Sequence, residues 1–285
     1  MNGWKKSLLG AYLYGTRPYR ALWNFRAARA QRAPVVVLFY HRVADEHPNG
    51  WTCPRALFER QMLWLKRRFD MVSLAEAQRR LREGNSRPAV HITFDDGYAD
   101  NNDFALPLLV REQIPCTYFV STHFIRHGVP FPHDAQRGVR LQPNNFDDLR
   151  RWAAEGIEIG AHTRTHPDIG KLSDPGRVRD EIVGAGEELQ QMLRRPVRYF
   201  AFPYGLPQSM TQRAFELADE AGYEAVCSAY GAYNFPGDDA FHIQRVHGDD
   251  DFLRFQNWMT IDPRKLDVPR YRYTLPSHRP EPVSV

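Results

Sequence analysis

Two adjacent carboxylates, Asp95 and Asp96, are the side chains of this sequence whose setting first points to chemistry. They follow the apolar and β-branched residues 90–94 and precede Gly97. Such a run predicts a buried strand that delivers both acids to a surface, followed by a turn. Because neighbouring carboxylates repel each other, a cation between them or a shared proton is needed to keep both buried. The alternative is an ordinary Asp-Gly turn, and this stretch alone leaves both interpretations open.

Two histidines four residues apart, His162 and His166, follow a second apolar run at residues 157–159. Two imidazoles and one carboxylate form a common hydrolytic metal site, which leaves positions open for water and substrate. In proteins that alternate strands and helices, catalytic groups gather at the carboxyl ends of the strands. A His pair and an Asp pair at two such ends together favour a metal-dependent hydrolase over a simple turn.

Strands and helices must alternate along most of the chain to position these side chains. Apolar runs predict strands at 35–40, 90–94, 117–120, 157–159, 197–202, 225–228 and 241–246. Amphipathic spacing and capping signals predict helices at 57–69, from Ser73, and at 106–111, 146–154, 173–193, 208–222 and 250–258. Residues 122–143, rich in Gly, Pro and His, predict a long loop. The alternation indicates a parallel sheet, open or closed, in a single α/β domain.

The composition is that of an ordinary globular protein. The chain has 285 residues, of which 42% are hydrophobic and 25% are charged, so it can bury a core without disulfides. Three widely spaced cysteines predict neither a disulfide framework nor a cysteine-based zinc site. The sequence has no Gly-x-Ser-x-Gly elbow and no His-Glu-x-x-His motif. Serine hydrolases are therefore disfavoured, and zincins are excluded.

The net charge of +4 is concentrated at the N-terminus. No acid precedes Asp45, and that segment carries eight Lys and Arg side chains, which leaves −4 for the remainder. This distribution argues against a nucleic-acid-binding body. The apolar run 8–14 is too short to cross a membrane, and the arginines that follow make a poor signal peptide. We expect a cytoplasmic or peripheral membrane protein, in which residues 1–33 either lie on an anionic membrane or pack on the domain as an ordinary helix.

Sequence motifs then point to a family. The chain resembles the NodB-type polysaccharide deacetylases, carbohydrate esterase family 4, over roughly residues 34–260. The resemblance rests on Thr93-Phe94-Asp95-Asp96-Gly97, His162-Thr163-Arg164-Thr165-His166, Phe200-Ala201-Phe202-Pro203-Tyr204-Gly205 and, at the opening strand, residues 38–43. It implies a distorted (β/α)7 barrel, with the motif-bearing part beginning near residue 89. Residues 1–33 would then be a basic, aromatic extension, and residues 261–285 an extended tail.

The resemblance also implies a division of roles. Asp96, His162 and His166 would hold a divalent metal, which we expect to be Zn²⁺, and Asp95 would act as the general base. A backbone N–H near Tyr204 is then the candidate oxyanion donor. The implied reaction removes acetyl groups, N-acetyl groups above all, from a polysaccharide or other glycan substrate.

Two further roles rest on single residues. His247, near the last predicted strand, is the candidate general acid that protonates the leaving amine, and a surface histidine at a strand end is the alternative. In the long loop, His133 and Asp134 could contact sugar or serve no such role.

One departure from the family concerns Ala201, where many members carry an arginine that pairs with the catalytic aspartate. Arg198 lies three residues earlier and would point the wrong way along a strand. Something else must therefore orient Asp95; His41 and Arg42 could reach the site from the first strand or could form structural hydrogen bonds. This departure keeps open a catalytically impaired sugar-binding protein on the same fold. The basic N-terminus keeps open a second alternative, a membrane-associated component of a polysaccharide assembly system.

Overall fold

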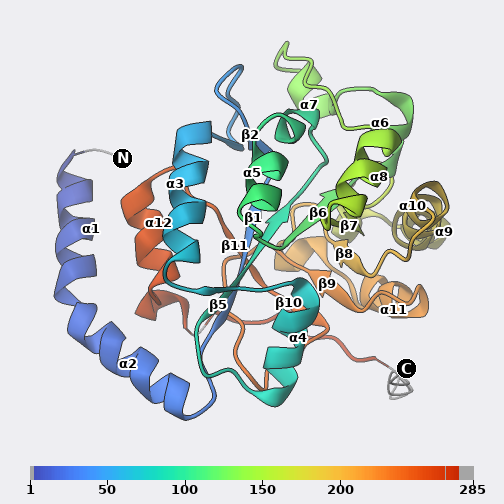
Figure 1. Cartoon of the computed structure of the whole chain (residues 1–285). Helices are drawn as coiled ribbons and strands as arrows, with labels where there is room; N and C mark the ends of the chain where they lie inside the picture. Colours follow the sequence, from blue (N-terminus) through green and yellow to red (C-terminus); the bar gives the residue numbers. More distant parts are fainter. Residues whose placement is uncertain (1–2, 267, 276–285) are drawn as a thin grey trace.

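The structure is a computed structural model that describes residues 3–266 and 268–275. A parallel sheet forms the centre of the molecule (Figure 1). The strands follow the order β10-β9-β8-β7-β6-β5-β1-β11, and each of their pairings is parallel. Their bounds are β1 (Val35–Tyr40), β5 (Ala89–Phe94), β6 (Cys116–Val120), β7 (Glu158–Ala161), β8 (Tyr199–Ala201), β9 (Ala225–Cys227), β10 (His242–Ile243) and β11 (Arg245–His247). A short strand, β4 (Asp70–Met71), also pairs with β5, while β2 (Arg42–Val43) and β3 (Thr52–Cys53) pair apart from this sheet.

The last strand segment nearly closes the sheet into a barrel. β10 pairs with β9, whereas β11 pairs with β1 at the opposite end of the strand order. Gln244 alone separates β10 from β11 in the sequence, so one short stretch of chain bridges both edges. Counted as one bent strand, β10 and β11 complete a ring of seven strands, which confirms the distorted (β/α)7 barrel.

Side chains that alternate along the strands separate two apolar layers. In β1, Val35 and Val37 belong to one buried cluster, whereas Val36 and Leu38 belong to the larger cluster packed with the helices. All six residues of β1 are buried. A parallel strand that is covered on both faces reads as a continuous apolar run in the sequence, which is why the strands could be predicted.

Helices cover the outside of the barrel and begin at identifiable caps. Ser73 Oγ accepts a hydrogen bond from the Glu76 N–H at 3.1 Å, which confirms the predicted helix start. Asn145 and Thr211 cap two further helices in the same way. Helices that lie between strands include α3 (Arg55–Lys66), α4 (Leu74–Glu83), α5 (Ala105–Arg111), α8 (Phe146–Ala154) and α11 (Gln212–Glu220), and α12 (Phe252–Met259) follows the last strand. Short 3₁₀ turns occur at Ala99–Asn102 (η1), Ile169–Lys171 (η2), Pro207–Ser209 (η4) and Pro263–Lys265 (η5).

Two segments differ from the sequence-based expectation. The prediction of one long loop at 122–143 is wrong, because this stretch contains α6 (Thr122–His127) and α7 (Pro132–Ala135). Phe124 and Phe131 bury themselves there against Tyr98 and Leu141, which gives both short helices an anchor. The predicted helix 173–193 is confirmed, but α9 (Pro175–Arg179) and α10 (Ala185–Leu193) are joined by a π-helical turn, η3 (Asp180–Gly184).

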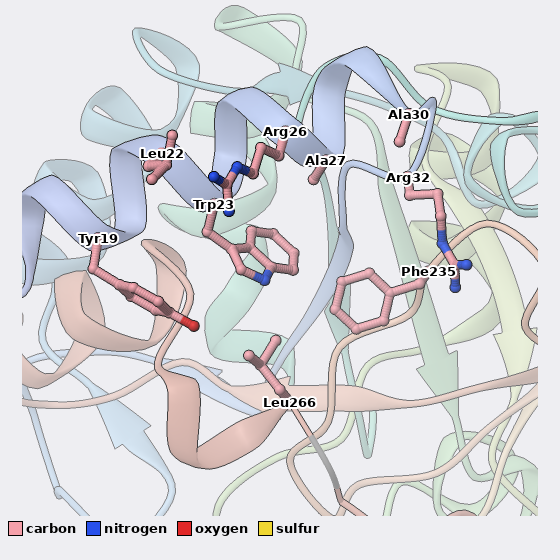
Figure 2. Close-up of a pocket in the computed structure, with 9 residues that line it drawn as sticks. All are labelled: Tyr19, Leu22, Trp23, Arg26, Ala27, Ala30, Arg32, Phe235 and Leu266. Carbon is pink, nitrogen blue, oxygen red and sulfur yellow. The ribbon is translucent and has the colours of Figure 1, made fainter.

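The N-terminal residues form two helices, α1 (Gly3–Gly15) and α2 (Arg17–Arg29), that run end to end along one side of the barrel (Figure 1). The buried Arg20 ties α2 to α12 by donating to the carbonyl oxygen and side chain of Asn257 at 2.9 and 2.7 Å. Figure 2 shows Trp23 of α2 facing Phe235 and Leu266. Within residues 3–266 and 268–275, no helix has both the length and the apolar character that a membrane crossing requires.

Residues 268–275 have no regular secondary structure. The ring of Tyr273 stacks on that of Phe215, with centroids 3.8 Å apart. The rest of the predicted tail, residues 276–285, lies outside the described residues.

Candidate metal centre and active site

The candidate residues meet at the carboxyl ends of the strands. Asp95 and Asp96 follow β5, His162 follows β7, Tyr204 follows β8 and His41 follows β1. Together with other side chains they surround one cavity of about 370 Å³. Its lining consists of Phe39, His41, Trp51, Asp95, Asp96, His133, Arg137, His162, His166, Phe202, Tyr204, Leu206 and Ala229. Parallel strands thus bring side chains far apart in the sequence to one place.

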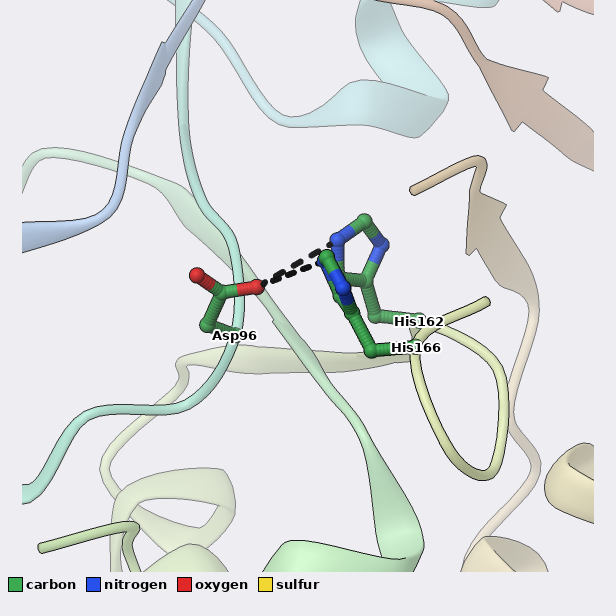
Figure 3. Close-up of side chains that lie close together, drawn as sticks. All are labelled: Asp96, His162 and His166. Carbon is green, nitrogen blue, oxygen red and sulfur yellow. Dashed lines mark ion pairs between the residues drawn. The ribbon is translucent and has the colours of Figure 1, made fainter. Parts of the chain in front are cut away.

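Asp96, His162 and His166 form a cluster suited to a metal ion (Figure 3). One ligand atom from each lies within 4.8 Å of the others, and among the described residues no other three His, Cys, Asp or Glu side chains meet in this way. Asp96 Oδ1 lies 3.1 Å from His166 Nε2 and 3.6 Å from His162 Nε2. Ligands bound to Zn²⁺ at ~2.1 Å in tetrahedral geometry are separated by ~3.4 Å, so these spacings fit the ion.

The buried carboxylate of Asp96 is also suited to binding a cation. Asp96 is 2% exposed, and its Oδ1 accepts no well-directed hydrogen bond despite the two nearby imidazoles. A buried carboxylate oxygen without such a bond is costly, and a cation between the three side chains would satisfy it. His162 supports this arrangement, because its Nδ1 lies 2.7 Å from the Ala201 carbonyl oxygen. A carbonyl can only accept, so Nδ1 carries the proton and Nε2 keeps its lone pair for a metal.

The loop that carries His166 is held in place by its own backbone contacts and by the π-helical turn. Thr163 Oγ1 accepts from the His166 N–H at 3.0 Å. Glu181, in η3 and almost fully buried, accepts from the backbone N–H groups of Arg164 and Thr165 at 2.9 and 2.8 Å. π-helical turns occur frequently at functional sites, and here the turn supplies the carboxylate that fixes the loop.

Several residues at the site hold the left-handed backbone conformation, which is unusual for residues with a side chain. Asp96, Thr163, His166 and Tyr204 have φ values of 69°, 64°, 58° and 61°. Such residues cluster at sites where surrounding structure enforces the geometry. The backbone therefore turns sharply at the ligand positions and at the candidate oxyanion donor.

A buried arginine from the last strand orients the candidate base. Arg245 of β11 is fully buried and donates from Nη1 to Asp95 Oδ1 at 2.7 Å and from Nη2 to Oδ2 at 2.9 Å. It also donates to Thr93 Oγ1 at 3.0 Å and to the Ser228 carbonyl oxygen at 2.9 Å. The two-pronged pairing fixes the carboxylate plane, and Arg245 thereby supplies the positive charge that Ala201 lacks.

The surrounding charges keep both carboxylates ionised. Burial is the largest influence on the pKa of Asp95 and raises it, but Arg245, His162 and His41 together lower it further, so the net pKa lies below the usual value. Burial likewise raises the pKa of Asp96, and His166, His41 and His162 together lower it further, with a net decrease. Burial lowers the pKa of His162 to about 4, which favours the neutral ring that a metal ligand requires.

Sequence reasoning did not assign a role to Arg245, although the residue carried a signal. It is a charged residue inside the predicted strand 241–246, and a charge within a buried strand needs a partner. The partner could not be named because it depends on β11 lying beside β1, which in turn adjoins β5. Those pairings depend on the closure of the barrel and not on any local pattern.

Tyr204 lies at the cavity with its side chain 58% exposed. Its ring centroid is 5.5 Å from that of His166. Among the described residues, the N–H of Tyr204 has no assigned acceptor. This N–H at a sharp turn beside the metal cluster keeps the oxyanion role open for the proposal below.

His247, the candidate proton donor, and His41, which could reach the site from the first strand, both pack against Trp51 but line different hollows. His41 lines the cavity with the metal cluster, whereas His247 lines an adjoining hollow of about 320 Å³. The Trp51 ring borders both spaces, with ring centroids 4.6 Å from His41 and 5.7 Å from His247. Burial lowers the pKa of both histidines, that of His247 to about 4. The structure thus brings His41, and not His247, together with the candidate base.

The remaining candidates divide in the same way. Arg42 turns away from the cavity and pairs with Asp100 at 2.8 Å, and Arg198 pairs with Glu158 at the surface. His133 lines the cavity. Asp134 is buried and accepts a hydrogen bond from the Tyr98 hydroxyl at 2.6 Å, so it supports the loop through an internal hydrogen bond.

Known proteins resemble this chain across the site. The sequence profile of the family described as "Polysaccharide deacetylase" matches residues 82–226. A chitooligosaccharide deacetylase of Bradyrhizobium sp. (strain ANU 289) is 28% identical over 162 residues, which are 55% of this chain and 63% of that protein. The putative polysaccharide deacetylase YxkH of Bacillus subtilis (strain 168) is 26% identical over 195 residues, 67% of this chain and 63% of YxkH. The chain therefore spans somewhat less than two thirds of the length of these curated relatives.

Solved structures share the fold. The deacetylase PplD of Streptococcus pyogenes, in complex with acetate, superimposes with a TM-score of 0.69 at 17% identity, covering 81% of this chain and all of the PplD chain. IcaB from Ammonifex degensii gives a TM-score of 0.66 at 24% identity, covering 80% of this chain and 98% of IcaB. At such low identity these likenesses establish the barrel fold alone.

Proposed function

Since this chain belongs to the polysaccharide deacetylase family, we propose that it is a metal-dependent hydrolase that removes acetyl groups, foremost N-acetyl groups, from a glycan. The observation that carries the proposal is a single cavity with two carboxylates in different settings. Asp96 faces His162 and His166, whereas Asp95 is held by Arg245. Adjacent acids with separate partners can perform separate tasks.

Asp96, His162 and His166 are the residues that would hold the metal, with Zn²⁺ as the ion that best suits two imidazoles and one carboxylate. A divalent cation bound there would supply Lewis-acid chemistry, polarising an acetyl carbonyl and lowering the pKa of a water molecule. The hydrogen bond from His162 Nδ1 to the Ala201 carbonyl presents Nε2 to the ion. Glu181 fixes the loop from which His166 reaches the same point.

Asp95 is the group we assign to proton abstraction. Arg245 binds one face of its carboxylate and keeps it ionised, while the side chain still lines the cavity. An ionised carboxylate beside the metal cluster can accept a proton from water as the water attacks the acetyl carbonyl. The fixed orientation matters because proton transfer requires hydrogen-bond distance to the reacting water.

Two further groups complete the assignment. The backbone N–H of Tyr204 would donate a hydrogen bond to the oxygen that becomes negative in the tetrahedral state. His41 would pass to the leaving amine the proton that Asp95 takes from water, since it shares the cavity with Asp95 and Asp96. His247 stays the alternative donor named by sequence, and it lines the adjoining hollow beside Trp51.

The cavity wall suits a sugar. Trp51 and Tyr204 expose aromatic faces on its rim, and their side chains are 45% and 58% exposed. Large exposed aromatic side chains at a hollow mark a binding site, and polar groups among them fix ligand orientation. His133 and Arg137 supply such polar groups in the lining.

A catalytically impaired sugar-binding protein was the main alternative, because Ala201 stands where relatives carry an arginine. Arg245 supports the enzymatic proposal instead, since it delivers the same charge to Asp95 from another strand. In this proposal Arg245 replaces the arginine that is absent at position 201.

Release of acetate tests the proposal directly. Purified protein would be chelated, reloaded with Zn²⁺ and incubated with N-acetylglucosamine oligomers of several lengths. We expect acetate with the reloaded protein, none after chelation, and a loss of about 10²–10⁴-fold in Asp95→Asn with metal content unchanged. The matched control is Asp103→Asn, whose exposed carboxyl lies outside the cavity. A fully metal-loaded protein that releases no acetate from any oligomer would favour the alternative, a protein that binds sugar without catalysis.

A pair of substitutions decides between the proton donors. His41→Gln should lower kcat by about 10²-fold, whereas His247→Gln should leave it within a few-fold of the unsubstituted protein. The reverse order would assign the acid to His247.

A further inference from the structure

Exposed large apolar side chains gather in two places on this molecule. Ten such side chains are exposed among the described residues, and three of them, Trp51, Tyr204 and Leu206, line the active-site cavity. One, Val129, lies in the loop after α6. The remaining six are Trp4, Leu8, Tyr14, Tyr19, Leu22 and Phe25, all on α1 and α2. Contiguous exposed apolar side chains mark an interaction surface.

On α1 the apolar residues form a stripe that faces outward. Trp4, Leu8 and Ala11 recur at a spacing of four and three residues, and all are exposed. Leu13, the buried residue of this helix, projects from the opposite side. The face that a solvent-exposed helix usually fills with polar side chains is therefore apolar here.

On α2 the outward face mixes apolar and basic residues. Leu22, Phe25, Arg26 and Arg29 are all exposed and follow helical spacing. The inward face carries Arg20, which is buried against α12. Arginines beside aromatic residues are typical of helices that lie in a membrane interface.

Most of the positively charged side chains on α1 and α2 have no acidic partner among the described residues. No acid precedes Asp45 in the sequence. Lys6 pairs with Asp251 at 3.3 Å, and Arg20 is bound within the protein. Arg42, beyond the two helices, pairs with Asp100. The five other basic side chains before Asp45 form no ion pair with any described residue; they are Lys5, Arg17, Arg26, Arg29 and Arg32. A partner that meets this surface must therefore be anionic.

A hollow of about 530 Å³ opens beside the same face (Figure 2). Its walls include Trp23, Phe235 and Leu266, with the two aromatic rings 5.9 Å apart. Arg26 and Arg32 also line it. An apolar space beside two arginines matches a molecule with a hydrocarbon tail and an anionic headgroup.

We propose that α1 and α2 form a docking surface for an anionic lipid bilayer, with Trp4, Leu8, Leu22 and Phe25 inserted into the interface and the unpaired cations against the headgroups. Aromatic and aliphatic side chains enter the headgroup region of a bilayer, while Lys and Arg bind its negative charge. Both features coincide on this surface. The bilayer would then hold the barrel at the membrane surface through its N-terminal side.

Co-sedimentation of the full chain with vesicles tests this surface. Vesicles of phosphatidylcholine alone would be compared with vesicles that contain about 30% phosphatidylglycerol. We expect binding at least about tenfold stronger to the anionic vesicles, and loss of most of it at about 1 M salt, where screening is nearly complete. The triple substitution Trp4→Ser, Leu8→Ser and Phe25→Ser, and the double substitution Arg26→Glu and Arg29→Glu, should each weaken binding about tenfold or more.

Matched controls separate this surface from general stickiness. Val129→Ser removes an exposed apolar side chain elsewhere, and Arg177→Glu reverses an exposed charge on α9. Both should bind vesicles as the unsubstituted chain does, and the substitutions on α1 and α2 should leave acetate release unchanged. Equal binding to both vesicle types, or equal loss in the controls, would overturn the proposal. So would self-association of the chain, measured by sedimentation velocity, that the triple substitution abolishes while vesicles recover no protein.

Discussion

The active-site cavity and the two N-terminal helices both expose large apolar side chains, yet they treat charge in opposite ways. In the cavity the buried charges face partners within the chain, as Arg245 faces Asp95 and His166 faces Asp96. On α1 and α2, Arg26 and its neighbouring cations form no ion pair with described residues. The charged side chains of the cavity thus pair with one another, whereas most cations of α1 and α2 have no acidic partner among the described residues.

This difference reflects two tasks. A catalytic site must hold reacting groups to within a fraction of an ångström, so its charges are fixed by contacts that exist before substrate arrives. A docking surface must leave its charges available, because the partner completes them. The predictions below test whether the two regions depend on different interactions.

The largest expected effect comes from removing a ligand of the metal cluster. His166→Ala should lose bound metal, measured by elemental analysis, and acetate release should fall at least about 100-fold, since even partners of metal ligands contribute 10–100-fold. His127→Ala, which removes an exposed histidine of α6, should change neither quantity. An active, metal-loaded His166→Ala protein would remove His166 from the site.

The next effect compares two arginines that differ in burial. Arg245→Met leaves Asp95 buried and unpaired, so the free energy of unfolding in urea should fall by about 3–5 kcal/mol. Arg198→Met breaks a surface pair with Glu158 and should cost at most about 1 kcal/mol. The double variant Arg245→Met/Asp95→Asn should recover part of the loss. Equal costs for the two single arginine substitutions would mean that the buried pair does not hold the site together.

A smaller and local effect is expected at the anchor of α2. Arg20→Met removes the hydrogen bonds to Asn257 and should weaken the attachment of α2 by about 1–3 kcal/mol. Amide hydrogen exchange should therefore accelerate in residues 3–29, while acetate release stays within about twofold. Arg29→Met, an exposed neighbour on the same helix, serves as the control. Loss of activity in Arg20→Met would show that the two regions are coupled.

The smallest effect concerns pH. His91 of β5 is buried between the Val72 carbonyl oxygen and Thr117 Oγ1, and burial lowers its pKa from 6.5 to about 4. The unfolded chain binds this proton below about pH 6.5 while the folded chain does not, so the stabilisation is complete above that pH and is lost as pH falls towards 4.

Unfolding curves from pH 7.5 to 4 check this sign. His91→Gln keeps a hydrogen-bonding side chain without the titration, so its stability should decline less steeply, by about 1 kcal/mol or more over the range. Residues 3–29 contain no acid and no histidine, so no side chain of the N-terminal helices itself titrates over this range. An identical decline in both proteins would contradict the assignment to His91.

Local patterns in the sequence predicted the parts of the fold that local physics controls. Buried parallel strands appear as apolar runs, and the Ser73 cap fixes a helix start through one hydrogen bond to a residue three positions on. The Asp96, His162 and His166 set could be proposed because parallel strands collect their carboxyl ends in one place. The family motifs then supplied the expected roles.

The contacts that escaped prediction depend on distant parts of the chain. Arg245 reaches Asp95 across 150 residues of sequence, through a barrel closure that no short window encodes. Glu181 supports the histidine loop from a π-helical turn that amphipathic spacing reads as plain helix. His41 and His247 line different hollows, although His41 follows β1 and His247 ends the adjacent strand β11. Each of these contacts depends on pairing between residues that are distant in the sequence, and no local sequence pattern encodes such pairing.

The left-handed backbone at the site limits how heat-stable this protein can become. A residue with a side chain loses about 1 kcal/mol or more in that conformation, and replacement by glycine would recover it. Gln113 and Arg194 hold the same conformation away from the cavity and are open to such replacement. At Asp96 and His166 the side chain is a proposed metal ligand, so glycine there would remove the group that the proposed function needs. Thermal stabilisation by this route would therefore be limited by the turns that carry the proposed ligands.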